Sequence, residues 1–249
     1  NELIVKLLST KGIYIGVTAT PGRLDLNNTF DNNNEKWVFF NTHPLYKGHD
    51  FFFPLSRNSE TYNLNLLKES SNNPKKELRE SLYRFLINVA YLNCFINKKE
   101  EKYIMLVHTS GKKADHTEDH QVIIKIFNEL QAANGDKFKK YLTEIIENIK
   151  KKYPGKERVL TEYIVTNSGN KNIVLMNSDT DKQVVNFEGG TENPASIFTI
   201  SIGGNIVSRG VTFNNLLTMF FSRDVKQKMQ QDTYIQRARM FGNRGNYLI

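Results

Sequence analysis

Residues 197–221 read IFTISIGGNIVSRGVTFNNLLTMFF, and this stretch decides the fold class. Its two apolar runs, 197–203 and 216–221, predict short strands that are buried on both faces of a sheet. The connection between them is polar and holds Gly203-Gly204 and Ser208-Arg209-Gly210. Glycines let backbone N–H groups approach a phosphate closely, and a serine and an arginine add side-chain donors. The stretch therefore predicts a buried sheet with an anion-binding turn at a strand end.

Strand and helix patterns alternate along the rest of the chain. Further strands are predicted at 12–17, 103–108 and 173–177, and helices at 75–97, 121–131, 136–152 and 232–241. In the first helix, apolar residues recur at spacings of three and four, and Cys94 is expected in the core. These apolar residues are Leu78, Leu82, Phe85, Leu86, Val89, Leu92 and Phe95. The alternation predicts an α/β fold, a parallel sheet with helices on both faces.

Composition limits the class of protein. Hydrophobic residues make up 39% of the 249 residues, which suffices for a core, and no apolar run is long enough to span a membrane. A single cysteine excludes an internal disulfide and fits a reducing cytoplasm, so we expect a cytoplasmic protein. The net charge of +8 is compatible either with a polyanionic partner or with a lysine-rich surface that only aids solubility.

An arginine-rich segment follows the second apolar run. Gln236 and Arg239 are three residues apart and share one face of the helix predicted there, and Arg244 follows just past its end. Arginine suits phosphate because its planar guanidinium donates two parallel hydrogen bonds and stays charged. The alternative reading is a solvated basic helix with ordinary salt bridges.

Polar segments follow three of the predicted strands. They are Thr18 to Pro21, His108 to Gly111 and Gly203 to Gly210. Ligands of parallel α/β sheets bind at the carboxyl ends of strands. We therefore expect these segments to contribute to one site.

These motifs resemble those of superfamily II helicases. The segments SRGVTFNNL (208–216) and DTYIQRARMFGNR (232–244) resemble the fifth and sixth helicase motifs, and Thr18-Ala19-Thr20-Pro21 resembles the third. Within the superfamily the chain is most similar to the Z-one endonuclease domain family, whose members resemble ATPase subunits of restriction and phage-defence systems. That family shows an IHTS-like strand end, here Val107 to Ser110, and a GGN-x-x-SRG element, here Gly203 to Gly210.

The resemblance implies a role for each matching residue. Gln236, Arg239 and Arg244 would be catalytic, with the arginines acting as fingers that reach ATP. Gly210 and Thr212 would lie near the nucleotide. Thr109, Ser110, Ser208 and Arg209 would contact the nucleic acid, and Thr18 and Thr20 would couple the two motor domains. Thr212 departs from the general helicase pattern, which has Asp there.

The resemblance also implies the wider organisation. Residues 1–99 would be the tail of a first motor domain with a linker helix, and 100–249 a second, RecA-like domain. ATP and Mg²⁺ would be bound mainly by residues that precede this chain, since no G-x-x-x-x-G-K-[ST] loop occurs in it. We expect the chain alone not to hydrolyse ATP. The expected partners are DNA, with duplex DNA favoured over RNA, and a nuclease or methyltransferase subunit or domain, with no membrane.

Two other functions remain open from the sequence. A metal-dependent endonuclease would need a ligand cluster, and His116, Glu118, Asp119 and His120 lie close together in the chain. Their spacing is not that of the H-E-x-x-H motif, and acidic residues at a helix start are expected anyway, so we expect no metal site. A non-catalytic interaction module that keeps the helicase fold is the third possibility.

Overall fold

The computed structural model describes residues 43–48, 51, 74–108, 112–176, 187–188, 191–204, 212–222 and 242–243. By its internal contacts the chain divides into two units, Asn1–Asn41 and Thr42–Ile249. All described residues belong to the second unit. The strand predicted at 12–17 and the helix predicted at 232–241 lie outside them, and the boundary predicted between residues 99 and 100 stays a prediction.

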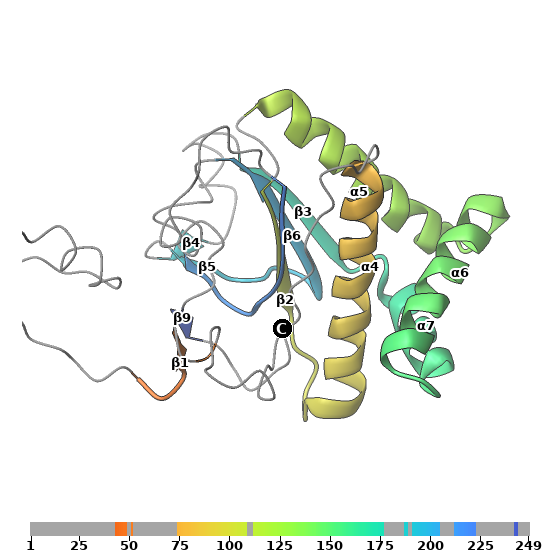
Figure 1. The fold of residues 1–249 in the computed structure, drawn as a ribbon, viewed down its shortest axis with the longest axis horizontal. Coiled ribbons are helices and arrows are strands. Elements are labelled where there is room, and N and C mark those ends of the chain that lie inside the picture. Colours follow the sequence, from red (N-terminus) through yellow and green to blue (C-terminus); the bar gives the residue numbers. More distant parts are fainter. Residues whose placement is uncertain are drawn as a thin grey trace, which may run out of the picture. The chain divides into compact units, whose positions relative to one another are not determined.

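A four-stranded parallel sheet forms the centre of the second unit (Figure 1). Its strands are β2 (Tyr103–His108), β3 (Lys171–Met176), β6 (Phe198–Gly203) and β8 (Leu216–Phe221), arranged in the order β3-β6-β2-β8. All four strands are confirmed within two residues of their predicted bounds. The α/β class with a parallel sheet is therefore confirmed.

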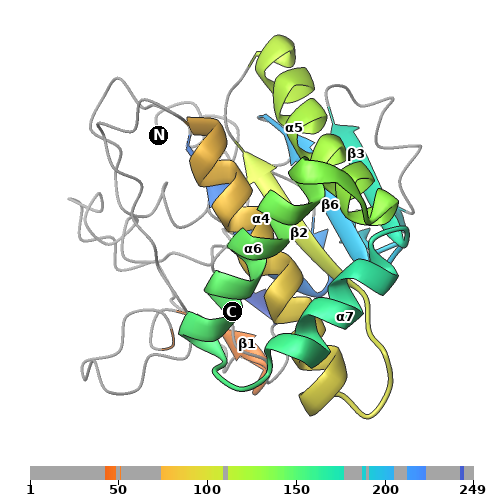
Figure 2. The same cartoon turned by 90° about the vertical axis from the view of Figure 1, so that its right-hand side faces the viewer.

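The described helices lie on one side of this sheet (Figures 1 and 2). They are α4 (Pro74–Tyr91), α5 (Lys113–Ala132), α6 (Gly135–Lys152) and α7 (Glu157–Asn167). Helices α4 and α5 pack against the strands, and α6 and α7 pack on α4 and α5 as an outer layer. Within the described ranges no helix residue joins the apolar cluster on the opposite face, so the predicted helices on both faces are not confirmed.

The helix predicted at 136–152 is confirmed, whereas α7 was not predicted. The start predicted for the preceding helix, residue 121, is wrong: α5 begins eight residues earlier, at Lys113. Charged residues from 113 to 120 look like a loop, but Asp115 suits the first turn of a helix, whose exposed N–H groups favour negative charge.

Side-chain alternation along the central strands builds two apolar layers. Met105 and Val107 join the larger cluster beneath the helices, while Ile104 and Leu106 join a smaller cluster on the opposite face. Strand β6 sends Phe198, Ile200 and Ile202 to the helical side. The ring of Phe198 lies 6.3 Å from that of Phe85 on α4 and 6.0 Å from that of Phe127 on α5. One aromatic side chain thus ties the sheet to two helices.

A register shift in β8 changes the face on which its later side chains lie. Leu216 pairs with Ile104, but Thr218 pairs with the next residue, Met105, so Leu217 is an extra residue in β8. Such a bulge changes which face the following side chains occupy. As a result Phe220 lies in the helical cluster although Leu216, four residues earlier, lies in the opposite one.

Helix α4 continues into a π-helix, η2 (Leu92–Ile96), after which the N–H of Asn97 donates to the carbonyl of Leu92 at 2.8 Å. The wider turn changes the direction of the side chains that follow Leu92. Leu92 is buried as predicted, but Phe95 is 42% exposed and Cys94 is only partly buried. The prediction that Phe95 and Cys94 belong to the core is therefore wrong.

Short strands complete the described structure. Strand β4 (Phe187–Glu188) pairs antiparallel with β5 (Thr191–Glu192), which pairs parallel with β7 (Thr212–Phe213). Strand β1 (Tyr46–Lys47) pairs antiparallel with β9 (Gly242–Asn243). Among the helices of the described ranges, none combines the length and the apolar character needed to cross a membrane.

Candidate functional site at the carboxyl edge of the sheet

Three neighbouring strands end beside one another at the carboxyl edge of the sheet. Strand β2 ends at His108, β6 at Gly203 and β8 at Phe221, and β2 lies between the other two. The chain leads from these ends directly into the segments that hold Thr109-Ser110, Ser208-Arg209-Gly210 and the arginines. The strand order therefore joins, at one edge, the starting points of three segments that are far apart in sequence.

His108 is the last residue of the central strand and is fully buried. It pairs in register with Phe221, and the two rings lie 5.1 Å apart. Its carbonyl accepts a hydrogen bond of 3.2 Å from the N–H of Ser222. The alternation of β2 places its side chain on the face of Ile104 and Leu106, opposite the helices. His108 thus locks the ends of β2 and β8 together.

The end of β6 has no side-chain bulk. Gly203 and Gly204 are both buried where the strand stops, and Gly203 pairs with Met176 of β3. A backbone without Cβ atoms can approach a phosphate or another chain segment closely. The glycine pair predicted to begin an anion-binding turn therefore does lie at the carboxyl edge.

An ion pair joins the first turn of α4 to the second turn of α5 near the same edge, since both helices begin there. The Nζ of Lys75 lies 2.7 Å from Oδ1 of Asp119 and 3.3 Å from Oε2 of Glu118. The Asp119 side chain is only 4% exposed, whereas that of Lys75 is 34% exposed. Partial burial lowers the pKa of Lys75, but the hydrogen bond and charge of Asp119, followed by those of Glu118, outweigh burial and raise it. The sequence reasoning missed this pair because its partners are 44 residues apart.

The histidines and acids at the start of α5 do not form a metal site within the described ranges. His116 and Asp119 are both 3% exposed, on the buried side of the helix. Asp119 is engaged with Lys75, and no group of three or more potential ligands is found among the residues that the structure describes.

Most of the predicted site residues lie outside the described residues. Thr212 is the exception, and its backbone forms β7, where it pairs with Thr191. The roles predicted for the other site residues stay predictions; these residues are Thr18, Thr20, Thr109, Ser110, Ser208, Arg209, Gly210, Gln236, Arg239 and Arg244.

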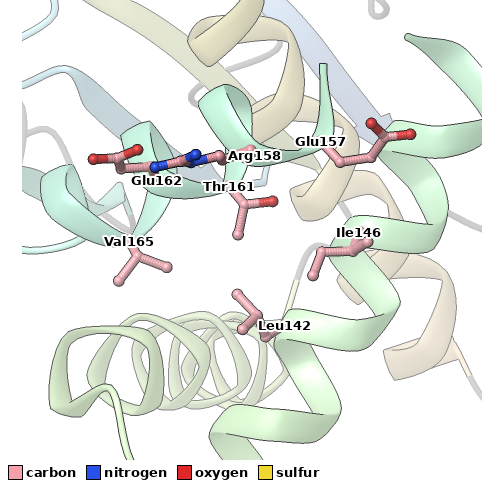
Figure 3. A pocket seen from close by; sticks show the side chains of 7 residues that line it. All are labelled: Leu142, Ile146, Glu157, Arg158, Thr161, Glu162 and Val165. Atoms are coloured by element: carbon pink, nitrogen blue, oxygen red, sulfur yellow. The ribbon is translucent and has the colours of Figure 1, made fainter. Parts of the chain in front are cut away.

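A shallow groove of about 460 Å³ lies between α6 and α7, away from the residues predicted to be functional (Figure 3). Leu142, Ile146 and Val165 point into it, and Glu157, Arg158 and Glu162 stand around its rim. Apolar walls of this kind suit an aliphatic side chain rather than a nucleotide. No residue of the carboxyl edge lines the groove.

The fold and this edge define an α/β domain with a parallel sheet whose polar motifs follow the carboxyl ends of its central strands. The model of the Z1 (Z-one) domain family matches residues 77–249. The match covers more than half of the chain, and the chain therefore belongs to the Z1 domain family. The comparisons with curated proteins and with solved structures found no match.

Proposed function

We propose that this chain is the C-terminal part of an ATP-dependent DNA translocase of helicase type. In this proposal residues 100–249 form the second, RecA-like domain of a motor in a restriction or phage-defence system. The motor is an ATP hydrolase that works in the cytoplasm on duplex DNA, with a nuclease or methyltransferase partner. The activity belongs to the longer protein, and the chain alone is inactive.

The arrangement of β6, β2 and β8 carries the proposal. The carboxyl ends of β6 and β8 lead into the two segments that resemble the fifth and sixth helicase motifs, and that of β2 leads into Thr109-Ser110, which resembles the strand end of the Z-one family. In parallel α/β sheets, ligands bind at this edge where the chain leaves neighbouring strands in different directions. Here β3 and β6 lie on one side of β2, while β8 lies on the other. The edge beside β2 is such a position, which supports a shared site for the three segments.

The residue types in these segments fit a phosphate ligand. Arg239 and Arg244 donate hydrogen bonds to phosphate oxygens and offset negative charge, while Gln236 supports them. Gly203 and Gly204 already lie at the edge, and Gly210 and Thr212 approach the nucleotide in the same proposal. Thr109, Ser110, Ser208 and Arg209 contact the DNA backbone. ATP would supply the phosphoryl group that passes to water, and Mg²⁺ would offset the charge on its oxygens; this hydrolysis would drive movement of the two motor domains.

DNA-stimulated ATPase activity of the full-length protein tests this proposal. We expect Arg244→Ala and Arg239→Ala to lower the turnover number by about 10³-fold or more, because an arginine finger contributes this much to phosphoryl transfer. Lys139→Ala is the matched control, since Lys139 is a cation on α6 with a side chain 77% exposed. It should leave activity within about twofold of wild type.

The family name suggests cleavage, so a nuclease assay with Mg²⁺ and plasmid DNA accompanies the ATPase measurement. Folded Arg239→Ala and Arg244→Ala variants that keep wild-type ATPase activity would refute the proposal. Plasmid cleavage without any ATPase activity would replace it with the endonuclease alternative, and the absence of both activities would favour a non-catalytic module.

A further inference from the structure

Exposed apolar side chains gather where α4 ends and α7 begins. The large hydrophobic residues exposed in the described ranges are Leu45, Phe95, Ile96 and Val159. Three of these belong to η2 and the start of α7, with exposed fractions of 42% for Phe95, 53% for Ile96 and 47% for Val159. Single exposed apolar residues need no explanation, but a cluster indicates an interaction site.

Contacts between η2 and α7 make these side chains one surface. The Nζ of Lys156 lies 4.2 Å from the centre of the Phe95 ring. In addition, the side-chain amide of Asn93 in η2 donates a hydrogen bond of 2.9 Å to the hydroxyl of Tyr163 on α7. Val159 lies three residues after Lys156 and four before Tyr163, so it shares the α7 face that meets η2.

The turn after η2 is held rigidly by side-chain hydrogen bonds. Asn93 donates to the carbonyl of Glu101 at 2.9 Å and accepts from the Glu101 N–H at 2.9 Å. Asn97 donates to Asn93 at 2.8 Å and to the Tyr103 hydroxyl at 2.9 Å. A surface that is ordered before binding loses less entropy when a partner binds.

Lysines surround the apolar residues. Lys98 and Lys99 are exposed in the turn, and Lys156 lies over Phe95. Within the described residues, no carboxylate forms an ion pair with any of these three lysines, whereas the nearby Glu100 accepts a hydrogen bond of 2.7 Å from Tyr163. Phe95, Ile96, Val159, Lys98, Lys99 and Lys156 together form the η2 surface, which is apolar at its centre and has three lysines around it. The carboxylates of Glu100, Glu101 and Glu157 follow these lysines in the chain, and those of Glu100 and Glu157 accept hydrogen bonds from the Tyr163 hydroxyl and the Gly155 N–H.

We propose that the η2 surface binds an acidic segment of a partner protein that inserts apolar side chains between Phe95, Ile96 and Val159. The three lysines complement carboxylates on that segment, which favours correct pairing and fast association. The Phe95 ring already packs against Lys156 and, at 5.5 Å, against Tyr91, and the other two residues are aliphatic. The surface therefore suits protein side chains better than stacked bases.

Two copies of this chain are less suitable as partners of each other. A two-fold contact would place the same surface on both sides, which brings the three lysines of one copy against those of the other. The η2 surface also lies toward the amino ends of the strands, because the turn from η2 leads into Tyr103 at the start of β2 (Figure 1). It is therefore separate from the carboxyl edge, and this inference does not depend on ATP hydrolysis.

Fluorescence anisotropy with a labelled synthetic peptide tests the proposal on the 249-residue chain. The probe is an acidic helical peptide in which leucines recur every three or four residues among glutamates, and a second probe carries glutamine in place of glutamate. We expect saturable binding of the acidic probe. The wild-type chain should bind the glutamine probe about tenfold or more weakly than the acidic probe. The acidic probe should lose about tenfold or more in affinity for each of two double variants, Lys98→Glu with Lys99→Glu and Ile96→Ser with Val159→Ser.

Control variants carry similar changes elsewhere on the protein. Lys137→Glu with Lys139→Glu reverses two cations of α6, whose side chains are 61% and 77% exposed, and Leu45→Ser removes an apolar side chain that is 46% exposed. Both should bind the acidic probe within about twofold of wild type. Circular dichroism checks that every variant is folded.

Three results would overturn the inference. One is equal binding of the acidic probe to wild type and to the η2-surface variants, or no binding at all. Another is tight binding of a labelled single-stranded oligonucleotide that Ile96→Ser with Val159→Ser abolishes, which would assign the surface to nucleic acid. The last is a dimer in analytical ultracentrifugation that the same variant dissociates, which would assign the surface to self-association.

Discussion

Asp119 differs from its neighbour Glu118 in burial, although both carboxylates contact Lys75. The Asp119 side chain is 4% exposed and lies 2.7 Å from the Lys75 Nζ, whereas Glu118 is 69% exposed and lies 3.3 Å away. A buried carboxylate depends on its partner cation far more than an exposed one does. The two positions therefore form a natural pair for comparison.

We expect Asp119→Ala to lower the free energy of unfolding by about 1–2 kcal/mol. A fully buried ion pair would lose more, but here Lys75 can still reach water and Glu118 when Asp119 is removed. Glu118→Ala should change it by less than about 0.5 kcal/mol, since exposed ion pairs contribute little. Urea denaturation of both variants measures the difference. Equal losses at the two positions would contradict the distinction between them.

The side chain of Asn93 forms hydrogen bonds with the residue that follows η2, with the backbone of the turn before β2 and with helix α7. Its partners are Asn97, both backbone groups of Glu101 and the hydroxyl of Tyr163 on α7. We expect Asn93→Ala to lower the free energy of unfolding by about 1–3 kcal/mol, because backbone groups at the turn lose their partners. Asn148→Ala is the control, since that amide makes one bond to the carbonyl of Glu144 within its own helix.

Chemical denaturation of both asparagine variants gives the comparison. The Asn148 change should stay within about 0.5 kcal/mol of wild type. An Asn93 variant as stable as wild type would show that water replaces the lost bonds, and the rigidity assigned to the η2 surface would then be wrong.

The elements differ in how far the sequence could predict them. Strands such as β2 and β8 are continuous apolar runs, because their side chains are buried on both faces, and this pattern is easy to recognise. The start of α5 was missed because its first turns carry charged residues, and the buried position of Asp119 depends on Lys75 of the neighbouring α4. The exposure of Phe95 follows from one wide turn in η2, which a spacing of three and four cannot reveal.

From the sequence, the direction of the chain in parallel strands predicts only the edge of the sheet at which the candidate site lies. Polar segments after parallel strands must begin at one edge, and His108 and Gly203 are indeed at that edge. Which strand lies beside which depends on long-range packing, as does the pairing of Lys75 with Asp119. The roles proposed for Arg239 and Arg244 rest on family resemblance and await the ATPase measurement.

Buried and partly buried tyrosines with raised pKa values make the stability of the protein sensitive to alkaline pH. Burial, followed by the charge of Tyr91, raises the pKa of Tyr153 from 10.0 to about 12. Burial also raises the pKa of Tyr83, with a further contribution from Glu144, and that of Tyr163, with one from Glu100. In the unfolded chain these hydroxyls ionise near pH 10, whereas the folded chain keeps them protonated to higher pH.

Stability should therefore fall as the pH rises from 10 towards 12, because the unfolded state then binds fewer protons than the folded state. Below pH 10 both states are protonated and this contribution is fully present. Tyr153→Phe should make the fall less steep, since it removes one of the ionising hydroxyls. Urea denaturation at a series of pH values measures both slopes, and parallel slopes for variant and wild type would contradict the expectation.

The position of β2 in the middle of the sheet has a consequence during synthesis. Both of its ladder partners, β6 and β8, come much later in the chain, after three further helices. When β2 leaves the ribosome its backbone groups have no strand to pair with, while α4 and α5 can already form. The apolar run YIMLVH must wait until Phe221 has been made, which gives chaperones a long period in which to bind it.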